Sequence, residues 1–132
     1  KQIMALIATD TYRLSNWLKS EYAPELAFCR AVVTVNDSAQ TLATGTVLGK
    51  VTATGKYKVC VQTASDGSQT ADAIVIDAVT IPATDTKVLV LLRGPATVSK
   101  NIVLHASHDL DAEKAAIYAA LEAKNIQVLD VV

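Results

Sequence analysis

The sequence predicts a small, single-domain, β-rich α+β fold. Short and mainly antiparallel strands form a partly open barrel, one helix follows near the C-terminus, and an extended N-terminal arm precedes the domain. The length of 132 residues suits one domain with its own core. Strand-like runs separated by turn-forming residues recur from residue 28 onward, and a long helical pattern occurs only late in the chain. We therefore assign residues 1–27 to the arm and residues 28–132 to the β-rich core.

The N-terminal arm contains an apolar start, KQIMALIATD, followed by TYRLSNWLKSEY. In the second stretch Leu14, Trp17 and Leu18 recur at spacings of three and four, which predicts a short amphipathic helix over residues 11–22 that stops before Pro24. Trp17 is the only tryptophan, and it has two interpretations. It either contacts a partner protein or packs on its own domain.

The first part of the core reads as a strand followed by a hairpin. The run FCRAVVTV is rich in β-branched residues and ends at the turn cluster Asn36-Asp37-Ser38. GTVLGKV and KYKVCVQ flank the turn residues Thr54 and Gly55, so these two runs predict a hairpin.

A second turn is predicted in SDGSQTADAIVI, where Asp66 and Gly67 form a corner and Gly67 takes a positive φ. The following run DAIVIDAVTI is predicted as strand up to Pro82. KVLVLLRG is apolar on both faces, which predicts a central strand that ends at Gly94-Pro95.

The C-terminal region predicts a helix over residues 111–124 and a last strand over residues 126–131. Either Asp109 or Asp111 suits the N-cap, and the interior of the helix is rich in alanine. Asn125 is expected to take the left-handed conformation that ends the helix.

Composition excludes several classes of partner. The net charge is −1 and aromatic residues make up 5% of the chain, so we expect neither nucleic acid nor an anionic membrane as a partner. No apolar run approaches the roughly 20 residues of a membrane span, and IMALIA is shorter than the core of a signal peptide, so we expect a soluble, unsecreted protein. Cys29 and Cys60 lack C-x-x-C spacing; two buried free thiols are favoured, with a disulfide as the alternative.

The best candidate for a chemical site is HASHDLD, which contains His105 and His108. Two imidazoles three residues apart beside carboxylates can bind a divalent metal if the segment is helical. No third strong ligand has a recognisable spacing, so a polar loop before a helix is the favoured interpretation. No G-x-S-x-G motif occurs, and GTVLGK is too short for a phosphate-binding loop. We therefore predict no catalytic, cofactor or metal site, and no enzyme.

The ordered set of motifs ATGTVLGKVTATGKYKVC, SDGSQTADAIVI and VLVLLRGPATV, followed by a helix and a strand, resembles the lambda-type head decoration proteins of tailed bacteriophages, also called capsid cement proteins. LSNWLKSEYAPELAFCRAVVTV is similar to the segment that leads into the same core in longer members. The resemblance implies a structural virion protein that is made in the host cytoplasm. It would bind the outer surface of the expanded capsid as trimers at threefold and quasi-threefold sites, and would stabilise the head.

By position, residues 1–10 correspond to the arm of that family, which orders on the capsid by adding to a sheet of the major capsid protein. The implied partners are the major capsid protein and the chain itself, as a homotrimer. The arm residues expected to contact the capsid are Gln2, Ile3, Met4, Ala5, Leu6 and Ile7. An alternative is a small β-barrel binding module, such as a phage tail or fibre component. A metal-dependent enzyme that uses His105 and His108 is a weaker one.

Overall fold

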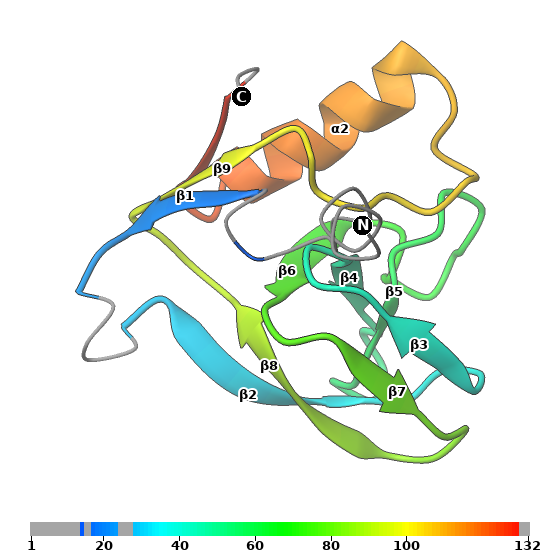
Figure 1. Ribbon diagram of the computed structural model, residues 1–132. Coiled ribbons are helices and arrows are strands. Elements are labelled where there is room, and N and C mark those ends of the chain that lie inside the picture. Colours follow the sequence, from blue (N-terminus) through cyan, green and yellow to red (C-terminus); the bar gives the residue numbers. More distant parts are fainter. Residues whose placement is uncertain (1–13, 15–16, 24–27, 130–132) are drawn as a thin grey trace, which may run out of the picture.

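The computed structural model describes residues 14, 17–23 and 28–129, in which ten strands and one helix form a barrel with a second layer above it (Figure 1). The strands are β1 (Leu18–Glu21), β2 (Arg30–Val35), β3 (Gln40–Leu42), β4 (Val47–Lys50), β5 (Tyr57–Val59), β6 (Ala71–Val75), β7 (Val79–Ile81), β8 (Thr86–Leu91), β9 (Ala96–Ser99) and β10 (Ile126–Leu129), and the helix is α2 (Asp111–Glu122). The predicted β-rich α+β class is confirmed.

Five strands close the barrel in the order β2-β5-β4-β6-β8. Every neighbouring pair is antiparallel except β2 with β5, which is parallel and contains a single residue pair, Val35 with Tyr57. The main-chain N–H of Asn36 donates to the carbonyl of Tyr57 at 2.9 Å and reinforces this contact. The barrel is therefore closed, not partly open, but its seam between β2 and β5 is very short.

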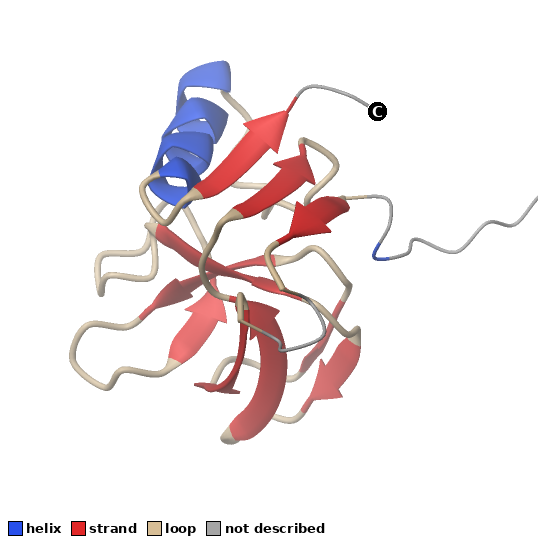
Figure 2. Cartoon of the chain, turned by 90° about the vertical axis from the view of Figure 1, so that its left-hand side faces the viewer, coloured by secondary structure: helices blue, strands red, loops and turns tan. Residues whose placement is uncertain are grey.

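The second layer is a three-stranded sheet in which β9 lies between β1 and β10. β1 is antiparallel to β9 and β10 is parallel to it. Figure 2 shows this sheet and α2 together on one side of the barrel. A separate two-stranded sheet pairs β3 with β7.

Strand β8 separates two apolar cores. Its residues Leu89 and Leu91 contact the interlayer core, which lies between the barrel and the second layer. Val88 and Val90 belong to the barrel core, which fills the barrel. Because alternate side chains of a strand point to opposite faces, a strand with apolar surroundings on both sides is apolar throughout. The prediction that KVLVLL is a central strand is confirmed.

The predicted amphipathic helix over residues 11–22 is wrong over its second half, because Leu18–Glu21 is strand β1. Pairing with β9 satisfies the main chain there, and this tertiary contact outweighs a helical spacing of three apolar residues. Residues 11–13 and 15–16 lie outside the described residues. Because β1 pairs within the domain, the stretch assigned to the arm, residues 1–27, includes part of the folded sheet.

Strand β1 is also joined to the barrel by an ion pair. The guanidinium of Arg30 in β2 donates from Nε to both carboxylate oxygens of Glu21, at 3.1 and 3.0 Å. The Glu21 side chain is only 5% exposed, so the two charges neutralise each other in a partly buried place. The hydrogen bond to Glu21 raises the pKa of Arg30 further above its ordinary value.

The run DAIVIDAVTI forms two strands instead of one. It bends after Val75, so β6 stays in the barrel while β7 leaves it to pair with β3. The run contains neither glycine nor proline, and the break depends on which strand each half can pair with.

The C-terminal predictions hold apart from the cap. α2 is two residues shorter than predicted, and its N-cap is Leu110, not Asp109 or Asp111. The carboxylate of Glu113 accepts the main-chain N–H of Leu110 at 3.2 Å, so an acidic side chain satisfies this end of the helix from within its first turn. Asn125 has φ +67°, as predicted. β10 covers the first four residues of the predicted last strand, and residues 130–132 lie outside the described residues.

The predicted hairpin of β4 and β5 is confirmed, and it contains a close approach at Gly49. A Cβ atom at this position would lie 2.0 Å from the carbonyl oxygen of Ser68. We expect Gly49→Ala to lower the free energy of unfolding by about 3 kcal/mol, since the clash is with main chain and overpacking typically costs about 1 to 3 kcal/mol. Urea unfolding measures this loss.

Gly55→Ala is the matched control. Gly55 has φ +75°, and the nearest atom to a Cβ there is Lys50 Cε at 3.9 Å. Only the strain of a left-handed conformation applies, which is about 1 to 2 kcal/mol. Equal losses in the two variants would contradict the close approach at Gly49.

Candidate functional site

Trp17, in the N-terminal part of the chain, is fully buried in the folded domain. Its indole Nε1–H donates to the hydroxyl of Thr44 at 3.0 Å, and that hydroxyl donates to the carbonyl of Ile76 at 2.6 Å. The main-chain N–H of Ser99 donates to the Trp17 carbonyl at 2.7 Å. Gly45 has φ +90°, and a Cβ there would lie 2.9 Å from the indole ring, so this position must lack a side chain. Trp17 is thus a fixed point within the stretch of residues 1–27 that was assigned to the arm.

The predicted contact residues Gln2, Ile3, Met4, Ala5, Leu6 and Ile7 lie outside the described residues. Of the two interpretations of Trp17, the structure supports packing on its own domain, since no part of the side chain is exposed. Sequence reasoning missed Thr44 and Gly45, which surround the indole. Thr44 lies 27 residues from Trp17, and no local spacing rule connects positions that far apart.

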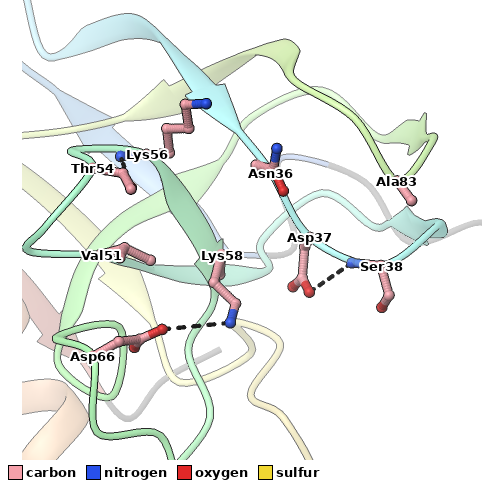
Figure 3. Close-up of a pocket in the computed structure, with 9 residues that line it drawn as sticks. All are labelled: Asn36, Asp37, Ser38, Val51, Thr54, Lys56, Lys58, Asp66 and Ala83. Carbon is pink, nitrogen blue, oxygen red and sulfur yellow. Dashed lines mark hydrogen bonds and ion pairs between the residues drawn. The ribbon is translucent and has the colours of Figure 1, made fainter.

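A surface hollow of about 550 Å³ lies near the end of β2 and the start of β5 (Figure 3). Its carboxylates are engaged by the chain itself. Asp37 accepts the main-chain N–H of Ser38 at 2.7 Å and that of Val59 at 3.1 Å. Figure 3 shows Lys58 and Asp66 pointing toward each other, with a distance of 3.5 Å between Nζ and Oδ2. These side chains hold turns and strand ends in place.

Asp66 is the carboxylate of the predicted corner, and the structure confirms that role. Gly67 has φ +105°, and Asp66 accepts hydrogen bonds from the hydroxyl of Ser68 at 2.6 Å and from its main-chain N–H at 3.1 Å. These bonds, with a smaller contribution from Lys58, lower the pKa of Asp66 from 3.8 to about 2. A carboxylate that stays ionised to such low pH is poorly suited to general acid–base catalysis near neutrality.

The two histidines are engaged in different places. His105 is exposed, and its Nδ1 accepts the main-chain N–H of Ser107 at 3.1 Å. His108 is buried, and its Nε2 lies 3.0 Å from the carbonyl of Cys60, which requires the proton to be on Nε2. Within residues 14, 17–23 and 28–129, no group of three or more His, Cys, Asp or Glu side chains could hold a metal ion. His105 lies in a polar loop, as predicted, whereas His108 is part of the packed interior.

Both cysteines are free and buried, as expected from their spacing. Burial raises the pKa of the Cys60 thiol to about 11, and the thiol faces the carbonyl of Gln69 at 3.3 Å. A thiol that remains protonated at neutral pH is a weak nucleophile. The candidate side chains described above therefore pack in the interior or stabilise turns.

Comparison with protein families gives a direct match. The family model described as bacteriophage lambda head decoration protein D matches residues 7–126, which is most of the chain. The chain belongs to this family. A search of curated proteins found no match.

Membership of the head decoration family gives the chain a structural role in a phage capsid, as a component of the virion. The family is not a known enzyme family. The matched range starts within the predicted arm, includes Trp17 and β1, and ends at the first residue of β10. No helix in the described ranges has the length and apolar character needed to cross a membrane.

The burial of Trp17 predicts a contribution to stability and none to direct capsid contact. We expect Trp17→Phe to lower the free energy of unfolding by about 2 kcal/mol, because it removes one hydrogen bond and part of a buried ring. Denaturant unfolding measures the loss, and cosedimentation of the folded variant with phage heads should be unchanged. Unchanged stability combined with lost head binding would show that the indole contacts the capsid.

The low pKa of Asp66 predicts a stabilising effect that acid removes. Folding lowers this pKa, so the effect is present above the ordinary value of 3.8 and is lost as the pH falls through about 2. We expect the difference in unfolding free energy between the wild type and Asp66→Asn to be constant from neutral pH to about pH 5, and to shrink between about pH 4 and pH 2. Ser68→Ala, which removes the strongest donor, should weaken this pH dependence, and a difference that did not vary with pH would contradict the assignment.

Proposed function

We propose that this head decoration protein binds the outer surface of the expanded phage capsid, as trimers at threefold and quasi-threefold sites, and stabilises the head. The single observation that carries the proposal is the family match over residues 7–126. The major capsid protein is the proposed partner, and the N-terminal arm is the proposed means of contact.

The composition of the arm supports this role. Residues 3–7 read Ile-Met-Ala-Leu-Ile, an apolar stretch with no charge. Such a stretch on an exposed segment favours aggregation unless a partner covers it. Extended backbone can add to the edge of a sheet, where main-chain hydrogen bonds supply affinity and alternate side chains enter pockets. The rigid anchor at Trp17 would tie such a contact firmly to the domain.

Trimeric binding supports head stabilisation by two effects. Three arms on one trimer bind by avidity, so contacts that are weak singly hold strongly together. A ligand that binds the expanded lattice and not its unexpanded or dissociated form favours the expanded lattice by its differential affinity. Neither effect needs a reactive group, which agrees with the engaged carboxylates and the protonated Cys60 thiol of the described domain.

Removal of residues 1–10 is predicted to abolish capsid binding without unfolding the domain. Leu14 and Trp17, which pack against the interlayer core, are both kept in the truncated chain, so it should unfold at a similar urea concentration to the wild type. Cosedimentation with expanded heads should show full binding by the wild type and none by the truncated protein. Unexpanded heads should bind neither.

A variant of unchanged length with residues 2–7 replaced by glycine and serine is the matched control, since it keeps the length of the arm and removes its apolar side chains. It should bind as poorly as the truncated protein. Normal binding by the truncated protein would refute the arm as the contact. Equal wild-type binding to expanded and unexpanded heads would refute selection of the expanded lattice, and binding to neither would favour a tail or fibre component.

A further inference from the structure

Strand β2 has one fully paired edge and one open edge. All six of its residues pair with β8, from Arg30 with Leu91 to Val35 with Thr86. On the opposite side, β5 begins where β2 ends, and only the pair of Val35 with Tyr57 connects them. The rest of that edge, residues 30–34, has no neighbouring strand among the described residues.

The backbone groups on the open edge follow from the hydrogen bonds at either end of β2. Cys29 accepts the N–H of Leu92 at 2.8 Å on the β8 side, whereas Asn36 donates to Tyr57 on the other side. Because main-chain groups alternate between the two edges of a strand, those of Arg30, Val32 and Thr34 face the open edge. Their N–H and C=O groups match one kind of ligand, another extended polypeptide.

Within the part of the chain that the structure describes, this edge lacks the usual protection against strand addition. Sheet edges are commonly blocked by a free lysine, a proline, a bulge or a covering segment. The register of β2 with β8 is continuous, and β2 contains no proline. Its only charged residue, Arg30, is held by Glu21, and the side chain of Val32 at the centre is 63% exposed. Lys87 is close to one end, where its Nζ donates to the Thr34 hydroxyl at 2.9 Å.

We propose that the open edge of β2 pairs with an extended segment of a second copy of this chain, and that this contact builds the trimer. The inference rests on the proposed function for the trimer itself. The edge is apolar at its centre and its one charge is neutralised, and the chain has a net charge of only −1, so copies repel each other little.

Each copy also carries strands that border a sheet. β1 and β10 lie at the two sides of the three-stranded sheet, which is separate from the barrel that contains β2. A contact between two different surfaces of the same chain is head-to-tail, and such a contact closes into a ring when the rotation fits. An accepting edge and a separate donor segment on every copy are therefore the arrangement that a threefold ring requires.

Val32→Pro tests this pairing selectively. It removes the N–H that faces the open edge and leaves the ladder to β8 intact, and sheet edges tolerate proline. We expect the Val32→Pro trimer to dissociate at a protein concentration about tenfold or more above that of the wild type. The variant loses an intermolecular hydrogen bond and gains a steric clash with the added strand. Val32→Ile keeps the N–H and the branched side chain, and it should remain within about twofold of the wild type.

The measurements are sedimentation equilibrium of the free protein and chemical crosslinking of the protein on expanded heads, with far-UV circular dichroism and urea unfolding to establish that each variant is folded. Val32→Lys is the second variant if Val32→Pro does not fold, because it puts a charge on the edge without changing the main chain. Trimers of the folded variant that match the wild type would overturn the β2 contact and leave the trimer in place. A wild type that is monomeric both free and on heads would instead refute the trimer.

Discussion

The burial of the Trp17 indole joins the two layers of this protein. The residue precedes β1 of the second layer, yet its N–H is satisfied by Thr44 and, through the Thr44 hydroxyl, by the carbonyl of Ile76 on the barrel side. An unsatisfied indole N–H in such a place would cost about 1 to 3 kcal/mol, so this chain of hydrogen bonds makes the burial favourable. The interlayer core around the indole then positions β9, β10 and α2 over the barrel.

Two parts of this molecule are proposed to bind a partner through extended backbone. One is the arm at residues 1–10, and the other is the open edge of β2, which belongs to the barrel wall. The proposed functions of the two are complementary, since one offers a strand and the other accepts one. The Arg30 and Glu21 ion pair connects these regions, because it links β2 to the strand that directly follows Trp17. A partner strand added to β2 would thus pair with an edge that the ion pair holds in place relative to β1.

The sequence predicted the parts of this fold that depend on local physics. Alternation and β-branching located β2 and the hairpin of β4 and β5, and the left-handed positions Gly67 and Asn125 followed from residue type alone. β1 was missed because its strand conformation depends on β9, which lies over 70 positions later in the chain. The division between β6 and β7 has the same origin, since each pairs with a different strand.

The candidate interaction sites were harder to predict than the fold, for a physical reason. Catalytic and metal sites need particular side chains, and these can be recognised in a sequence. His105 and His108 were candidate metal ligands because imidazole is such a side chain. Strand addition uses main-chain groups that every residue except proline possesses. Val32 is an ordinary strand residue in the sequence. It becomes distinctive only because β5 begins beside Val35, so that no strand among the described residues pairs with the N–H and C=O of Val32. A surface for strand addition is therefore recognised from the strand pairing of a structure, and not from the residue types of a sequence.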